Sequence, residues 1–140
     1  MFRKSRIIVV IMVLLAAPSW AFAQMKEGLW EITSQTHIEG VPISPPPVTF
    51  KQCLSKKDAV PKDQDKSTEC KIIKQKMSGN TLIYTTECKN QQGVMHATGN
   101  ITYSGNVMEG KTTASFNARG QSSMKMNTSM KGRYLGTCPK

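Results

Sequence analysis

The sequence predicts an all-β fold: an antiparallel meander of about seven strands that form a strongly curved sheet or a small barrel. Two observations support this prediction. Apolar and polar residues alternate with a period of two along most of the chain, whereas the helical period of about 3.6 residues is almost absent. Clusters of Gly, Asn, Ser and Pro separate these alternating runs at intervals that suit hairpins. A chain of 140 residues has room for one domain.

Residues 1–23 have the composition of a secretory signal peptide. A basic start is followed by an apolar stretch over residues 7–17 and then by Ala21-Phe22-Ala23, which fits the small-x-small rule of signal peptidase. The apolar stretch has 11 residues. As a helix it would span about 17 Å, which is too short for a hydrocarbon core of about 30 Å. We therefore expect cleavage before Gln24, export to the periplasm, and a single β domain over 24–140 without a transmembrane segment.

The expected strands cover residues 28–38, 48–53, 70–77, 81–88, 94–103, 107–116 and 121–134. In the first strand, Trp30 and Ile32 lie on one face. Glu39-Gly40 can turn the chain, and the prolines that follow favour an extended loop because proline cannot donate to a sheet ladder. The residues after the second strand resemble a helical capping box, which predicts one short helical turn near 56–60, before Pro61.

The positions of two cysteines support the hairpin between the third and fourth strands. A three-residue loop, Ser78-Gly79-Asn80, places Cys70 directly opposite Cys88. Directly opposed Cβ atoms lie about 4.5–5.5 Å apart, close to the separation of about 3.5–4.5 Å in a disulfide. The same register pairs Met77 with Thr81, Ile72 with Thr86, Lys71 with Glu87, and Lys74 with Tyr84. The same tripeptide recurs as Ser104-Gly105-Asn106 and predicts a second hairpin.

An even number of cysteines in a small exported chain predicts disulfides. With Cys70 and Cys88 paired, Cys53 and Cys138 pair by elimination, although four cysteines allow three connectivities. The chain contains no CxxC and no CxxCH sequence, which disfavours a thioredoxin-type site, a zinc ribbon and covalent haem. In the loop-entropy model the two bridges stabilise the fold by about 3 and about 4.5 kcal/mol.

Three sequence motifs, and the order in which they occur, are similar to those of a known family. They are Gly28-Leu-Trp-Glu-Ile-Thr33 after the signal, Thr49-Phe-Lys-Gln-Cys-Leu54 after the proline-rich loop, and Gly132-Arg-Tyr-Leu-Gly-x-Cys138 at the end. With both Ser-Gly-Asn hairpins, residues 25–138 resemble the exported bacterial family catalogued as domain of unknown function 3617. The resemblance implies a protein of the Gram-negative envelope with a small disulfide-bonded β domain. It implies no activity, and the motif residues look structural.

No pattern in the mature chain points to catalysis. His37 and His96 belong to no recognisable triad motif, and Glu27 and Glu31 are poorly placed for paired-acid chemistry. Bridged cysteines cannot act as nucleophiles. Asp63-x-Asp65-x-Ser67 begins like a calcium-binding EF-hand loop, but the Gly and Glu required later are missing, which favours a solvated loop. We therefore expect no catalytic residue, no cofactor and no enzymatic activity.

Methionine is the one residue type whose pattern suggests binding. Met124, Met126 and Met130 share one face of the last expected strand. Clustered thioethers select Cu(I), and Met95 and His96 could add ligands to such a site. The alternative, which we favour, is that methionine fills gaps in a core whose aromatic content is only 6%.

The net charge of +10 falls to +7 without Arg3, Lys4 and Arg6 of the signal, which leaves 16 basic against 9 acidic residues. The lysines lack interleaved aromatic residues and known RNA-binding motifs, so we expect no nucleic-acid partner. Loose attraction to anionic lipid headgroups is the alternative to a solvated basic surface. The sequence thus predicts a non-enzymatic binding or envelope-associated module for an apolar ligand or lipid. Copper handling through the methionine face and a purely structural adaptor role are the alternatives.

Overall fold

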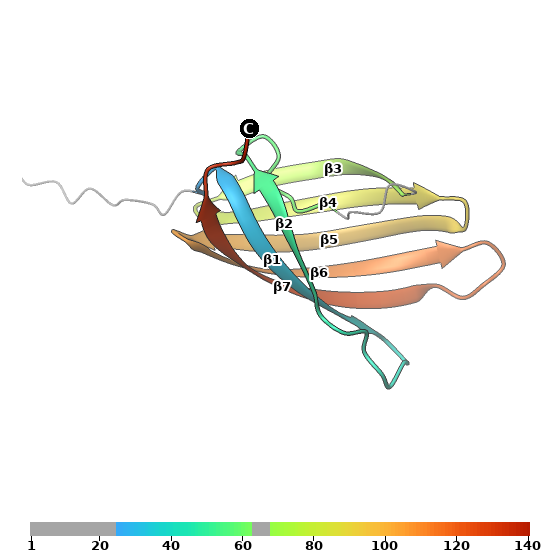
Figure 1. The fold of residues 1–140 in the computed structure, drawn as a ribbon. Helices are drawn as coiled ribbons and strands as arrows, with labels where there is room; N and C mark the ends of the chain where they lie inside the picture. Colours follow the sequence, from blue (N-terminus) through green and yellow to red (C-terminus); the bar gives the residue numbers. More distant parts are fainter. Residues whose placement is uncertain (1–24, 63–67) are drawn as a thin grey trace, which may run out of the picture.

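The structure, a computed structural model, describes residues 25–62 and 68–140, and it contains seven strands (Figure 1). They are β1 (Gly28–Ile38), β2 (Val48–Leu54), β3 (Glu69–Ser78), β4 (Thr81–Asn90), β5 (Gly93–Ser104), β6 (Val107–Ala118) and β7 (Met124–Gly136). All neighbours in the sheet are antiparallel, in the order β2-β1-β7-β6-β5-β4-β3. The predicted all-β meander is confirmed. The predicted signal peptide and the segment that begins like an EF-hand loop lie outside the described residues.

The sheet curls into a half-barrel, which confirms the predicted strong curvature. In Figure 1, β1 and β2 run at a steep angle to β4 and β5, so the strand direction turns far from one edge of the sheet to the other. The two edge strands, β2 and β3, do not pair with each other. Glycines on the concave face leave room for large side chains of the neighbouring strands to extend over them. A Cβ atom at Gly132, for example, would lie only 2.8 Å from Cγ of Met108 on the neighbouring strand.

One end of the concave face carries the core. Trp30 is fully buried, and its ring makes edge contacts with Tyr103 and Tyr134 at centroid distances of 5.7 and 5.5 Å. We call this region the packed half, which comprises the buried side chains of Trp30, Ile32, Leu54, Leu82, Ile101, Tyr103 and Met108. Trp30 and Ile32 thus lie on one face of β1, as predicted, and both are fully buried.

The chain after β2 forms bends, so the short helical turn predicted near 56–60 is wrong. The Ser55 hydroxyl does accept a hydrogen bond from the Asp58 N–H at 3.1 Å, as in a capping box. However, Ser55 and Asp58 also exchange two backbone hydrogen bonds, at 3.0 and 3.3 Å, which close this segment as a tight turn. Ala59 is then buried, and its carbonyl accepts a hydrogen bond from the Tyr103 hydroxyl at 2.5 Å. Contacts with the packed half thus override the local helical signal.

The two Ser-Gly-Asn hairpins have two-residue loops. In the first, Ser78 lies opposite Thr81, so the predicted three-residue loop is wrong. Gly79 and Gly105 are the first loop residues, with φ values of 61° and 66°, and no other type of residue has a positive φ in the described chain. Positive φ at the first loop position alone is the requirement of a type II′ turn, whose backbone twist matches the right-handed twist of the flanking strands.

A β-bulge in β3 compensates for the shorter loop. It lies between Ile72 and Lys74, and beyond it Cys70 faces Cys88 as predicted. The predicted pairs on the cysteine side of the bulge are confirmed, whereas those on the loop side shift by one residue. Thus Lys71 faces Glu87 and Ile72 faces Thr86, but Lys74 faces Thr85 instead of Tyr84, and Met77 faces Leu82 instead of Thr81.

Both predicted disulfides are present, and together they account for all four cysteines. Cys70–Cys88 joins β3 to β4 across 18 residues of sequence, and Cys53–Cys138 joins β2 to the end of the chain across 85 residues. Two disulfides in a small domain indicate an oxidising location outside the cytoplasm. In the described residues, no helix is long and apolar enough to cross a membrane.

Candidate functional site

The concave face contains a cavity of about 570 Å³ beside the packed half. This volume lies in the range of about 300–1,000 Å³ that is typical of small-molecule sites. Six strands, all except β2, and the loop after β2 contribute to its walls. The lining includes Thr36, Val60, Pro61, Ile72, Tyr84, Met95, Ala97, Thr112, Ala114, Met126, Thr128, Met130 and the Cys70–Cys88 disulfide.

Small side chains explain why this part of the sheet is hollow. In the packed half, β5 and β6 present Ile101, Tyr103 and Met108 to the interior. Further along the same strands, Ala97 and Ala114 lie directly opposite each other and replace those large side chains. We call this region the hollow half, which comprises Met95, Ala97, Ala114, Phe116 and Met126. The missing side-chain volume is what opens the cavity.

A row of hydroxyl groups separates the two halves. Tyr84, Thr112, Thr128 and Thr36 occupy directly opposed positions on β4, β6, β7 and β1, with Gly99 of β5 between the first two. The Tyr84 and Thr112 hydroxyls are hydrogen-bonded at 2.5 Å, and those of Thr36 and Thr128 at 2.9 Å. All four side chains line the cavity, and we refer to them as the hydroxyl row.

Gly99 lets the Tyr84 side chain reach across β5. A Cβ atom at this position would lie 2.7 Å from the Tyr84 hydroxyl oxygen and 2.7 Å from the Thr112 hydroxyl oxygen, so a larger residue would displace both. Burial raises the pKa of Tyr84 above its usual value of 10.0, and the hydrogen bond with Thr112 offsets part of this rise. The Tyr84 side chain therefore presents a neutral O–H group to the cavity.

The family described as Protein of unknown function (DUF3617) matches residues 25–138. The chain belongs to this family. The match spans all seven strands and all four cysteines, so the cavity and the hydroxyl row lie within the DUF3617 domain. The predicted family membership is confirmed. Searches of the curated proteins and of the solved structures found no match for the chain.

The DUF3617 domain brings only part of the predicted methionine set together. Met126 and Met130 line the cavity, and Met95 joins them from β5. Met130 is 8% exposed and packs over Gly110, whereas Met124, at the start of β7, is 43% exposed and lies outside the cavity lining. The cavity thus holds three thioethers, two of which belong to the set predicted from the last strand.

His96 lies on the opposite face of the sheet from these methionines. It alternates along β5 with Met95 and Ala97, which both face the cavity. On the convex face its Nδ1 lies 3.6 Å from a carboxylate oxygen of Glu87. His96 therefore cannot share a site with the thioethers. In the part of the chain that the structure describes, no three His, Cys, Asp or Glu side chains are grouped as a metal site requires.

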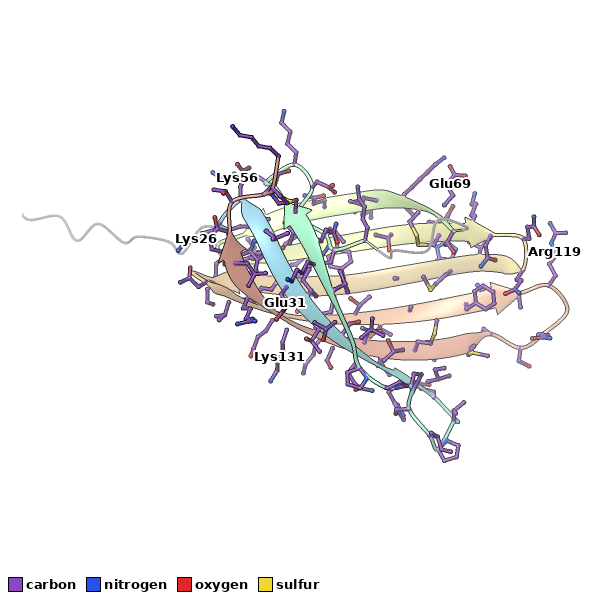
Figure 2. All side chains as sticks on the ribbon, viewed as in Figure 1. Lys26, Glu31, Lys56, Glu69, Arg119 and Lys131 are labelled. Atoms are coloured by element: carbon purple, nitrogen blue, oxygen red, sulfur yellow. A yellow bond between two sulfur atoms is a disulfide. The ribbon has the colours of Figure 1, made fainter. Side chains whose placement is uncertain are left out.

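Charged side chains lie mainly on the outside of the half-barrel. Figure 2 shows the labelled side chains, such as Lys56, Glu69 and Arg119, extending outward from the ribbon. On the convex face, Arg133 Nε donates to Glu31 Oε1 at 2.8 Å. A hydrogen bond from Lys89 is the main reason why the pKa of Glu87 is lowered, and burial opposes it. Among the described residues, the charged side chains other than Lys62 lie outside the cavity lining.

Lys62 is the single charged side chain among the cavity-lining residues that the structure describes. Its Nζ lies 2.9 Å from Oδ1 of Asp58, so a carboxylate from the same loop balances its charge. The polar character of the cavity therefore comes from hydroxyl groups. The hydroxyl row is not recognisable in the sequence alone, because its members are distant in sequence and meet only through the register of five strands.

Proposed function

We propose that this protein is a non-enzymatic binding module of the periplasm that holds an apolar small molecule or a lipid in the concave cavity. The observation that carries the proposal is the hollow half itself. Its floor of alanines and its thioether walls form a mainly apolar recess of about 570 Å³ beside the packed half. Burial of apolar ligand surface there is favourable by about 25 cal/mol per Å² before the costs of binding.

The chemistry of the lining favours binding over catalysis. The described lining offers aliphatic groups, thioethers, a disulfide, neutral hydroxyls and the ammonium group of Lys62, which is paired with Asp58. Such groups hold a ligand by shape and a few hydrogen bonds, whereas proton transfer needs groups that titrate near the working pH. The oxidising location indicated by the two disulfides is consistent with export to the periplasm.

Filling the cavity with a larger side chain tests the proposal. Ala114→Leu adds three carbon atoms to the floor of the hollow half, and Ser115→Leu adds comparable bulk to the next residue of β6, on the opposite face. We use pyrene, an uncharged hydrocarbon whose fluorescence spectrum reports the polarity around it. We expect the wild type to bind pyrene, Ala114→Leu to weaken binding by about tenfold or more, and Ser115→Leu to change it by less than about twofold.

Two results would contradict this function. One is a wild-type protein that leaves the pyrene spectrum unchanged, and the other is equal affinity of the two leucine variants. Thermal melting of each variant shows whether it is folded under the conditions of the titration. Native mass spectrometry of protein purified from the periplasm is an independent check, because a retained molecule adds its mass to that of the chain.

Copper handling is the second candidate, favoured by the three thioethers of Met95, Met126 and Met130 in one cavity. Cu(I) titration of the wild type against a variant with Met95, Met126 and Met130 all changed to Leu tests it, and Met124→Leu, outside the cavity lining, is the control. Copper handling predicts a clear loss of affinity in the variant, because leucine has no sulfur ligand. Equal affinities would end this candidate and leave the methionines as packing residues.

A further inference from the structure

The hydroxyl row has mainly apolar neighbours on both sides. Towards the packed half it borders the row of Leu82, Ile101 and Met130. Towards the hollow half it borders Ala97, Ala114 and Met126, and one further hydroxyl group, that of Thr86 on β4. A purely hydrocarbon ligand in this cavity would displace the water that hydrates these hydroxyl groups and would offer them no hydrogen bond in its place. Covering a polar group without a new hydrogen bond carries a free-energy cost.

The row retains hydrogen-bonding capacity beyond its own two bonds. Each hydroxyl has one O–H donor and two acceptor lone pairs. The pair Tyr84–Thr112 uses one O–H in its hydrogen bond, and so does the pair Thr36–Thr128. The second O–H of each pair has no partner among the residues that the structure describes. Two donors are thus available to a ligand oxygen at the boundary between the halves.

The charges around the cavity disfavour an ionised ligand group. Lys62 is at the cavity lining, but its ammonium group is already bound to the carboxylate of Asp58 at 2.9 Å. A carboxylate or phosphate transferred from water into the hollow half would find no unpaired positive charge among the cavity-lining residues that the structure describes, and such a transfer is costly. Neutral oxygen acceptors such as carbonyl, ester or hydroxyl groups match the available O–H donors without this cost.

We propose that the ligand is an uncharged amphiphile whose oxygen accepts hydrogen bonds from the hydroxyl row. Its hydrocarbon part lies over Ala97 and Ala114, beside the thioethers of Met95 and Met126. This inference rests on the proposed function, because it assigns a ligand class to the same cavity. It adds that the ligand has a neutral polar group and that four residues of the row recognise it.

The first test compares ligands of equal chain length. Decanol, methyl decanoate and decanoate compete with pyrene for the wild-type protein at neutral pH, where decanoate is ionised. We expect decanol and methyl decanoate to displace pyrene at concentrations about tenfold lower than decanoate does. Decanoate binding as tightly as decanol would overturn the inference.

The second test removes one hydroxyl pair of the row. Thr36→Val/Thr128→Val keeps the branched shape of both side chains and deletes both hydroxyls. The matched control is Thr33→Val/Thr49→Val, which deletes a hydroxyl pair with the same 2.9 Å separation between the same types of residue outside the cavity lining. We expect the first variant to bind decanol about two- to tenfold more weakly, and the control to bind it as the wild type does.

Pyrene separates the two possible failures. It has no polar group, so the Thr36→Val/Thr128→Val variant should bind pyrene at least as tightly as the wild type does. If the wild type binds neither pyrene nor decanol, the proposed function itself is wrong. If pyrene binds but decanol affinity is the same in the valine variant and the wild type, the hydrocarbon site stands and the assigned ligand class is wrong.

Discussion

The packed half and the hollow half belong to the same strands, yet they differ in almost every property that matters for function. Both follow the same alternation, and both face the concave side of the sheet. In the packed half, β5 and β6 carry Ile101 and Met108, which are fully or almost fully buried. In the hollow half they carry Ala97 and Ala114, and a cavity lies above them. A change of side-chain size along one strand is enough to divide a sheet into a packed region and a region with a cavity.

The two disulfides differ in the same way. Cys53 lies one residue before Leu54 of the packed half, and its bridge to Cys138 anchors the end of the chain there. The Cys70–Cys88 bridge lines the cavity beside the hollow half. The difference teaches that one bridge mainly maintains the fold, whereas the other also shapes the site.

Removing the bridges one at a time should give large effects on stability. The Cys53–Cys138 bridge closes a span of 85 residues, and Cys70–Cys88 closes one of 18. By loop entropy, Cys53→Ser/Cys138→Ser should lower the free energy of unfolding by about 4.5 kcal/mol and Cys70→Ser/Cys88→Ser by about 3 kcal/mol. Urea denaturation measures both losses. A larger loss from the shorter span would contradict the division between the two halves.

Truncation of aromatic side chains compares the halves directly. Trp30→Ala in the packed half removes a fully buried side chain and should cost about 3–5 kcal/mol. Phe116→Ala in the hollow half removes a partly exposed side chain and should cost less than about 2 kcal/mol. Urea denaturation again gives the two free energies. Equal losses would mean that the hollow half contributes as much packing as the core does.

Two buried tyrosines offer a finer comparison. Tyr103→Phe leaves the carbonyl of the buried Ala59 without its side-chain donor, so it should cost about 1–3 kcal/mol. Tyr84→Phe removes the hydrogen bond between the Tyr84 and Thr112 hydroxyls, but Thr112 lies at the wall of the cavity, where water can take the place of the lost partner. This change should lower the free energy of unfolding by about 0.5–1.5 kcal/mol. The comparison fails if chemical denaturation shows that Tyr84→Phe is the more costly change.

The same tyrosines predict a small effect at alkaline pH. Burial raises the pKa of both Tyr103 and Tyr84 in the folded protein above the usual value of 10.0. Above pH 10 the unfolded chain therefore loses these protons first, and the free energy of unfolding falls as the pH rises. The decrease should be smaller in Tyr103→Phe than in the wild type. Denaturation curves between neutral and alkaline pH test this, and parallel pH profiles would contradict it.

Local patterns predicted most of the fold. Alternation and turn residues were enough to place seven strands, because each hairpin depends on residues that are close in sequence. The symmetry of Cys70 and Cys88 about Gly79 was enough to predict both bridges. The loop length was wrong, since a shorter loop plus a bulge after Ile72 gives the same pairing of the cysteines. Two compensating one-residue changes leave no trace in the spacing.

The failed helical turn has a different cause. Ser55 and Asp58 do form the capping contact that their sequence suggests, but the next residues are buried against Tyr103. The burial of Ala59 and the hydrogen bond to its carbonyl both depend on β5, which is distant in sequence. Local propensity is a weak preference, and tertiary contacts of this kind override it.

The cavity was the least predictable part. The size difference between Ile101 and Ala97 is visible in the sequence. Whether it opens a cavity depends on which residues lie opposite them in the sheet. The hydroxyl row needs the correct register of β1, β4, β5, β6 and β7 at once, and a one-residue error in any strand would send its side chain to the other face. The same strand geometry places His96 on the opposite face from the cavity, so it does not join the methionines that line it.

The sequence by itself determined the all-β class, the two disulfides and the family, because alternation, turn chemistry and cysteine spacing are local or symmetric properties. Only the tertiary structure decided that the sheet curls around a cavity, that Ala97 and Ala114 form its floor, and that Tyr84 and three threonines meet in one row. The physical reason is that a cavity is missing volume between residues distant in sequence, which becomes visible only when the strands are aligned in space.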